Sequence, residues 1–314
     1  MSKLDPYQHL KISLNPDGSV TRLPTAAATG ETPLLSGHAV LSKDVTLDAA
    51  KKTWLRIYLP ARLPSNDTTV ARLPIIFFFH GGGWIRTCIA DAATHDNCNR
   101  ISAEVPAVLV AVELRLAPEN RLPAQYEDAA DAVVWVRDQA ADSAAGDHWI
   151  RDYADLSRCY LYGVSCGANV AYNAALLLQD MKLHPLKIAG TILNQPFFGA
   201  KKRTKSELEL AADDNLPLPV QDLLWELALP VGTDRDHRFS NPFVVKEKVN
   251  KIGRCLVIGF GGDPLIDRQQ DLVKMLAEEG VAVEARFDDA GFHGVDMVDS
   301  KRATAVLNFI KTFV

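Results

Sequence analysis

The sequence lacks the marks of a membrane protein and of a nucleic-acid-binding protein. No apolar run approaches the ~20 residues that a membrane-spanning helix needs. The chain has 34 lysines and arginines against 39 aspartates and glutamates, with both signs interspersed, so we expect no surface for nucleic acid. Residues 201–205 form a basic cluster, and a solvated loop is a simpler interpretation of it than a phosphate or lipid site.

Cysteine is also scarce, because the chain has only five, and no pair of them has the spacing of metal ligands. An odd number of cysteines argues against a disulfide framework as well. Reduced thiols in a cytoplasmic protein are the simplest account. The first residues are polar and no apolar stretch of a signal peptide follows them, which points to the same compartment.

What the sequence does contain is a serine between two glycines. Residues 163–167 read GVSCG, directly after the apolar run 159–162. A strand, then G-x-S-x-G, then a helix is typical of a nucleophile elbow, in which glycines permit a strained turn and the hydroxyl faces a cleft. Ser165 is therefore the candidate nucleophile. Cys166 would lie at a helix N-terminus, where the pKa of a thiol falls. We nevertheless expect its thiol to be a passive neighbour of Ser165 and not the nucleophile.

A second motif, HGGGW at residues 80–84, follows the apolar run 73–79. Consecutive glycines let the backbone turn its N–H groups toward a substrate without interference from a Cβ. Loops of this type supply the donors of an oxyanion hole in esterases. The oxyanion donors that we predict are the backbone N–H groups of Gly81, Gly82 and Cys166. Supporting or pocket-lining roles are expected for the rest of the motif, namely His80, Gly83 and Trp84.

An acid and a base follow the serine along the chain. Asp263 comes after the apolar run 254–260, and His293 comes after the alternating segment 281–287. Serine, aspartate, histidine is the chain order of α/β-hydrolases, and loops after strand ends are where open α/β sheets place their sites. The serine would attack an acyl carbon, the histidine would carry its proton, and the aspartate would orient the histidine. Asp267 is a competing carboxylate, but a structural role at a helix start fits it better.

The order of elements predicts one α/β domain spanning residues 1–314. Strands and helices alternate from residue 73 onward, which is typical of a mostly parallel sheet with helices on both faces. The alternation breaks at about residues 200–248, where helices are inserted just before the loop that carries the acid. An insertion at this point predicts a helical cap over the cleft, because an esterase must shelter its acyl intermediate from water.

Beyond these motifs, the chain resembles plant carboxylesterases of the hormone-sensitive-lipase-like branch of α/β-hydrolases over nearly its whole length. The resemblance is carried by residues 15–22, by LRLAPENRLPA at 114–124, by WELALP at 225–230 and by GDPLIDRQ at 262–269. It implies an α/β-hydrolase fold whose cap is completed by the N-terminal segment, about residues 1–45. It also implies hydrolysis of a carboxylic ester without a metal or an organic cofactor. Within the family, esterases of small specialised metabolites, including deacetylases of alkaloid pathways, look most similar.

The sequence departs from the usual family pattern at several positions near the site. At the elbow, Val164, Cys166 and Ala168 stand where the family usually has aspartate, alanine or serine, and glycine. At the expected pocket wall, Leu114 and Trp84 replace a tyrosine and a phenylalanine. No triad member is lost, so we expect a change of substrate preference rather than of chemistry.

Two other functions on the same scaffold remain open alternatives. Gibberellin receptors resemble this family but lack the catalytic histidine, whereas His293 is present here. Non-hydrolytic relatives, such as dehydratases and cyclases, often have an altered oxyanion loop or nucleophile, whereas both are intact here. We therefore expect a serine carboxylesterase that acts on a small ester, acetyl or another short acyl, of a specialised metabolite. Monomer and homodimer are equally compatible with the sequence.

Overall fold

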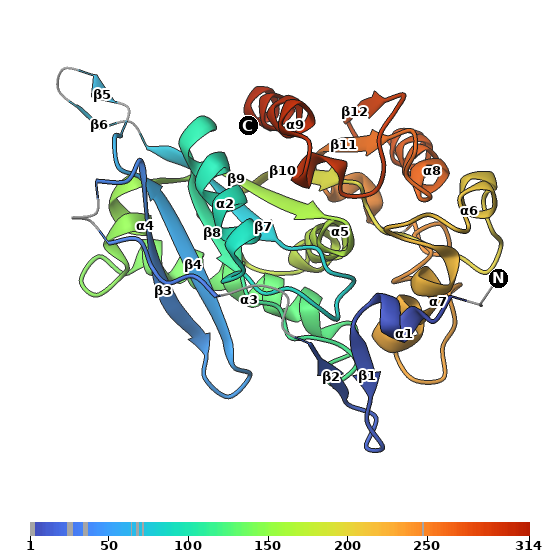
Figure 1. The fold of residues 1–314 in the computed structure, drawn as a ribbon. Coiled ribbons are helices and arrows are strands. Elements are labelled where there is room, and N and C mark those ends of the chain that lie inside the picture. The colour runs from blue at the N-terminus through green and yellow to red at the C-terminus, as the bar shows by residue number, and fades with distance from the viewer. Residues whose placement is uncertain are drawn as a thin grey trace.

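The computed structural model of the protein describes residues 4–23, 28–33, 37–63, 65–66, 69–70, 72–246 and 248–314. The strands of its central sheet are β3 (Val40–Asp48), β4 (Thr53–Pro60), β7 (Leu73–Phe79), β8 (Val108–Val112), β9 (Ala154–Val164), β10 (Ile188–Asn194), β11 (Arg254–Phe260) and β12 (Val283–Asp288). They are ordered β12-β11-β10-β9-β7-β8-β4-β3 (Figure 1). β4 is antiparallel to both of its neighbours, and the other pairs are parallel. The predicted mostly parallel α/β sheet is confirmed.

Helices cover both faces of this sheet (Figure 1). The helices of the described residues are α1 (Pro6–His9), α2 (Ala92–Glu104), α3 (Ala124–Ala141), α4 (His148–Tyr153), α5 (Cys166–Leu178), α6 (Lys205–Glu209), α7 (Leu218–Ala228), α8 (Ile266–Glu278) and α9 (Ser300–Phe313), with short 3₁₀ turns at Val249–Lys251 and Val295–Met297. Of these, α1, α6 and α7 belong to the segments predicted as a cap. Along β7, Phe77 joins a buried cluster with α3, α5 and α8, while Phe78 joins another with α2 and α9. Successive side chains of a strand face opposite ways, so a strand covered on both faces is a continuous apolar run. None of the described helices is long and apolar enough to cross a membrane.

The two segments predicted to form a cap lie next to each other. The N-terminal segment contributes α1 and a hairpin of β1 (Ile12–Leu14) and β2 (Val20–Arg22), and a second small hairpin pairs β5 (Ser65–Asn66) with β6 (Thr69–Val70). Figure 1 shows α1 beside α7, and the His9 imidazole is 3.2 Å from the carbonyl oxygen of Asn215. Residues 1–3, 24–27, 34–36 and 247 of the predicted cap segments lie outside the described residues.

Candidate active site

Ser165 occupies the sharp turn between β9 and α5. Its backbone has φ 56° and ψ −120°, a conformation that residues other than glycine rarely adopt and that stores strain. Contacts explain the flanking glycines: a Cβ on Gly163 would lie 1.9 Å from the carbonyl oxygen of Gly167. A Cβ on Gly167 would lie 2.1 Å from the carbonyl oxygen of Phe79. The motif therefore folds as a tight strand-to-helix turn, with Cys166 as the first residue of α5.

The imidazole of His293 lies between Ser165 and Asp263. Its Nε2 is 2.8 Å from the Ser165 Oγ, and its Nδ1 is 2.8 Å from the Asp263 Oδ2. Asp263 is fully buried, and its carboxylate also accepts hydrogen bonds from the Gln269 side chain and the Leu265 N–H, each at 2.8 Å. The structure thus brings together the three residues singled out from the sequence. In this chain of contacts, the imidazole and the fixed carboxylate can activate the hydroxyl as a nucleophile.

Acidic residues set the protonation behaviour of His293. Burial, the largest single influence, lowers its pKa, but the charge and hydrogen bond of Asp263, together with the charges of Asp296 and Asp213, outweigh burial and raise the pKa above its ordinary value of 6.5. An imidazolium formed by proton transfer is therefore stabilised in place. The competing carboxylate, Asp267, lies in the first turn of α8 and accepts the backbone N–H of residue 206 at 2.8 Å, which is a structural role.

A second set of contacts, which no sequence motif indicated, holds the turn after His293. Gln195 is fully buried with φ 49°, and its Oε1 accepts the Gly294 N–H at 2.5 Å. Its Nε2 is 3.4 Å from the Oδ1 of Asp296, whose Oδ2 accepts a hydrogen bond from the Asn194 amide at 2.7 Å. Burial raises the pKa of Asp296. In the sequence, the only available indication was a pair of polar amides directly at the end of an apolar strand.

The glycine loop borders the elbow. A Cβ built on Gly81 would be 3.6 Å from the Cβ of Ser165, and Gly82 and Gly83 have φ +97° and +64°. The N–H groups of Gly81 and Gly82 donate to no acceptor among the described residues. The Cys166 N–H belongs to the first turn of a helix, where N–H groups have no partner within the helix. The three N–H groups predicted as oxyanion donors therefore come from the two segments that meet at Ser165.

His80 and Trp84 hold the glycine loop from within the protein. The His80 Nδ1 is 2.8 Å from the carbonyl oxygen of the next residue, and burial lowers the pKa of this imidazole. Trp84 is buried and packs on Phe197 and Trp225, with ring centroids 5.3 Å and 4.5 Å away. Leu114 is also a core residue. Neither Trp84 nor Leu114 lines either cavity at Ser165, so they do not form the pocket wall as expected; Trp84 packs behind the lining residue Phe197.

The thiol of Cys166 is buried against the same loop. Its Sγ accepts the backbone N–H of Trp84 at 3.2 Å. Burial raises the pKa of this thiol to about 12, although backbone hydrogen bonds oppose the effect. The expectation that the helix N-terminus lowers this pKa is therefore wrong, because loss of hydration outweighs the helix dipole. A thiol with so high a pKa is a poor nucleophile at neutral pH.

Two cavities meet at the hydroxyl of Ser165 and the imidazole of His293. The inner cavity, of about 190 Å³, is also lined by Phe78, Asn97 and Val164, none of which lines the outer one. The outer cavity, of about 540 Å³, is bordered by both segments predicted as a cap, through residues His9, Leu10, Leu216, Val220 and Leu224. Among the described residues, no group of three or more histidine, cysteine and carboxylate side chains is placed to hold a metal ion.

Comparisons with known proteins agree with this arrangement. Residues 76–297 match a family model described as alpha/beta hydrolase fold. The chain is 51% identical to the probable carboxylesterase 9 of Arabidopsis thaliana, with 99% of this chain and 97% of that protein aligned. It is 44% identical to a 3-O-acetylpapaveroxine carboxylesterase of Papaver somniferum, with 99% of each covered. A solved esterase from Pyrobaculum calidifontis has the same fold, with a TM-score of 0.72 at 23% identity over 88% of this chain and 84% of that one. The chain therefore belongs to the α/β-hydrolase family, among the plant carboxylesterases.

Proposed function

We propose that this carboxylic ester hydrolase cleaves a short-acyl ester of a specialised metabolite through an acyl-enzyme on Ser165. The observation that carries the proposal is the pair of 2.8 Å contacts that join His293 to the Ser165 Oγ and to the Asp263 carboxylate. A proton on Nδ1 is favoured by the buried carboxylate, which leaves the Nε2 lone pair facing the hydroxyl.

The chemistry follows from these positions. The Ser165 Oγ attacks the carbonyl carbon while its proton moves to the His293 Nε2, and the carbonyl oxygen gains negative charge. The N–H groups of Gly81, Gly82 and Cys166 stabilise that charge. The imidazolium then returns its proton to the departing alkoxide, and the alcohol leaves the acyl-serine. Water attacks the acyl-serine by the same route, so each cycle consumes one ester and one water and releases one alcohol and one acid.

The two cavities support a division of the substrate between acyl and alcohol parts. We assign the acyl group to the inner cavity, whose volume of about 190 Å³ suits a short chain. The larger outer cavity, of about 540 Å³, would hold the alcohol under the cap segments. The relative at 44% identity is a 3-O-acetylpapaveroxine carboxylesterase, which supports an acetyl ester of a specialised metabolite as the substrate.

Hydrolysis of 4-nitrophenyl acetate, butyrate and octanoate tests this function. We expect kcat/KM to be high for the two short esters and to fall for octanoate, because the long chain exceeds the inner cavity. Asn97→Ala enlarges only the inner cavity and should raise the ratio of butyrate to acetate turnover. Its matched control, Val220→Ala, enlarges only the outer cavity and should leave that ratio unchanged.

The outcomes separate the proposals. Absence of turnover for all three esters, with binding retained, would favour a receptor over a hydrolase. If octanoate were the best substrate, the protein would still be an ester hydrolase, but the assignment of a short acyl group to the inner cavity would be wrong.

A further inference from the structure

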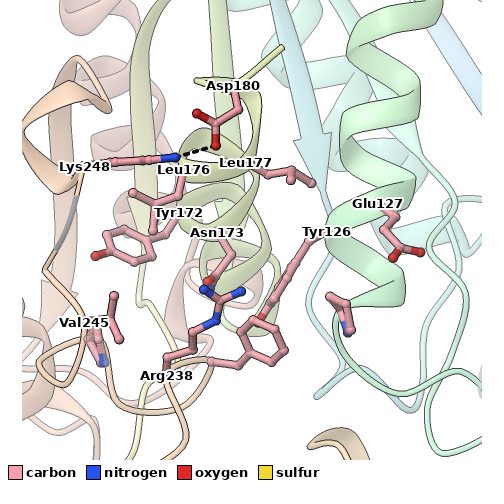
Figure 2. A pocket seen from close by; sticks show the side chains of 13 residues that line it. Tyr126, Glu127, Tyr172, Asn173, Leu176, Leu177, Asp180, Arg238, Val245 and Lys248 are labelled. Carbon is pink, nitrogen blue, oxygen red and sulfur yellow. Dashed lines mark hydrogen bonds and ion pairs between the residues drawn. The ribbon is translucent and has the colours of Figure 1, made fainter.

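A separate pocket lies beside α5, between the start of α3, the second half of α5 and residues 238–245 with Lys248 (Figure 2). Its volume of about 320 Å³ is near the lower end of the range for small-molecule sites. None of its lining residues borders either catalytic cavity. The pocket is therefore a second site and not an extension of the first.

Most of the pocket wall is apolar. The rings of Tyr126, Tyr172 and Phe239 line it together with the aliphatic side chains of Leu176 and Val245. The rings of Tyr126 and Phe239 pack edge to face, with centroids 5.0 Å apart. Walls of this kind bury the body of a small ring or a branched chain.

Buried hydrogen bonds hold this wall in place. The Tyr126 hydroxyl donates to the Asn169 Oδ1 at 2.7 Å, and the Asn169 Nδ2 donates to the Phe239 carbonyl oxygen at 2.8 Å. The Asn173 side chain donates in turn to the Asn169 carbonyl oxygen at 2.9 Å. The pocket is thus preformed, which lowers the ordering cost of binding.

Arg238 places a positive charge at this pocket. Its guanidinium lies over the Phe239 ring, 5.1 Å from the centroid, and points toward Asn173 in Figure 2. It makes no ion pair or hydrogen bond with any residue in the described ranges. Guanidinium groups pair well with carboxylates, because their N–H donors match two oxygens at once.

Within the part of the chain that the structure describes, the two acids that line the pocket have basic partners. Asp180 pairs with Lys248, as Figure 2 shows, and Glu127 pairs with Arg115 at 3.2 Å. Repulsion of an incoming anion by these acids is thereby reduced. Among the described lining residues, Arg238 is the cation that remains for a ligand.

Tyr172 contributes a buried ring to the wall. The side chain is 2% exposed, and its hydroxyl points away from Arg238 in Figure 2, so only the ring faces a ligand. Its ring is fixed by edge-to-face packing on Phe198, with centroids 5.4 Å apart.

We propose that this pocket binds a small amphipathic carboxylate, whose acid group pairs with Arg238 and whose apolar body lies among the aromatic rings. The site is independent of the ester hydrolysis at Ser165. Its ligand class follows from an unpaired arginine among the described lining residues and an apolar wall in a small preformed space.

Isothermal titration calorimetry of the full chain with 4-phenylbutyrate tests this proposal. We expect one site per chain. Arg238→Gln should weaken binding at least about tenfold, because a charge-assisted pair is lost. Val245→Trp should abolish measurable binding, because the larger side chain fills the pocket. The matched control is Arg100→Gln, which changes an exposed arginine paired with Glu104 on α2 and should bind like the wild type.

Three results would each overturn the proposal. The first is the absence of binding to the wild-type protein. The second is an unchanged affinity in either Arg238→Gln or Val245→Trp. The third is an equal affinity for the neutral 4-phenylbutan-1-ol, which would remove the role of the carboxylate.

Discussion

Trp84, Thr87, Ser165 and Gln195 all have positive φ, and all four lie at the catalytic cavities or directly support their walls. Each such backbone conformation lowers the free energy of unfolding by about 1–3 kcal/mol, and it persists only where surrounding contacts hold it in place. At Ser165 the strained turn holds the side-chain hydroxyl at the two cavities. At Gln195 it turns the side chain toward the loop that carries His293. Strained residues at this scale therefore fix the positions of nucleophile and base.

Asp296→Asn should shift the pH profile of ester hydrolysis. The charge of Asp296 favours the protonated form of His293, and that form cannot act as a base. Removing the charge lowers the pKa of His293, so the rise of kcat/KM with pH should begin at lower pH. In the wild type, the pKa of His293 is raised above 6.5, the ordinary pKa of histidine. The rise of kcat/KM should therefore lie at a pH above 6.5.

The measurement is kcat/KM for 4-nitrophenyl acetate from pH 5 to 9. Glu284→Gln removes an exposed acid on β12 that pairs with Arg286, and it should leave the profile unchanged. If the pH profiles of Asp296→Asn and the wild type had the same midpoint, the charge of Asp296 would have no effect on the pKa of His293.

Cys166→Ala should retain most of the activity. The backbone N–H of residue 166 is kept, and the buried thiol is a poor nucleophile because its pKa is raised to about 12. The Trp84 N–H loses its acceptor, so stability should fall by about 1 kcal/mol. Turnover and thermal unfolding measure the two effects, and a loss of activity by orders of magnitude would instead assign chemistry to the thiol.

At the scale of elements, we propose that the glycine loop and the start of α5 form one oxyanion hole. Gly82→Pro should lower turnover about 10²-fold or more, because it removes a predicted oxyanion donor and cannot adopt φ +97°. Gly232→Pro is the matched control, since Gly232 also has positive φ but lies in an open turn away from the cavities. Circular dichroism checks folding. A folded Gly82→Pro with wild-type turnover would show that the loop is an ordinary turn.

The helix α6 is tied to α8 by a buried ion pair. Arg268 and Glu207 are both nearly inaccessible and contact at 2.9 Å. Glu207→Ala should cost about 3–5 kcal/mol of unfolding free energy, because it leaves a buried guanidinium unpaired. Glu209→Ala breaks the exposed pair with Lys205 on the same helix and should cost less than about 1 kcal/mol. Urea unfolding compares the two variants. Equal losses of unfolding free energy would contradict the claim that the buried pair contributes more to stability than the exposed one.

At the scale of the whole molecule, the sheet brings together residues that are far apart in the chain. The sequence predicted the strands that precede the elbow, the glycine loop, the acid and the base, and it singled out the three candidate triad residues, because apolar runs and motifs are local patterns. It did not predict the Gln195–Asp296 contact, since two polar residues 101 positions apart have no spacing rule. The high pKa of the Cys166 thiol was also missed, because burial depends on packing between distant segments. For the same reason, both catalytic cavities and the pocket at Arg238 became visible only in the fold.

The cap that we propose is likewise a property of the whole molecule. The proposed cap segments come from the N-terminus and from residues 200–248, and in the folded structure they meet at the outer cavity. We propose that they shelter the acyl-enzyme from bulk water while the larger part of the substrate is held beneath them.

Covalent labelling tests the central claim most directly. The purified protein is treated with a fluorophosphonate, digested, and mapped by mass spectrometry, and the Ser165→Ala variant is treated in parallel. We predict one phosphonyl group per chain on Ser165, no label in the variant, and a loss of ester turnover in the variant by several orders of magnitude. Labelling that persists in Ser165→Ala, on Cys166 or on any other residue, together with retained turnover, would contradict the account.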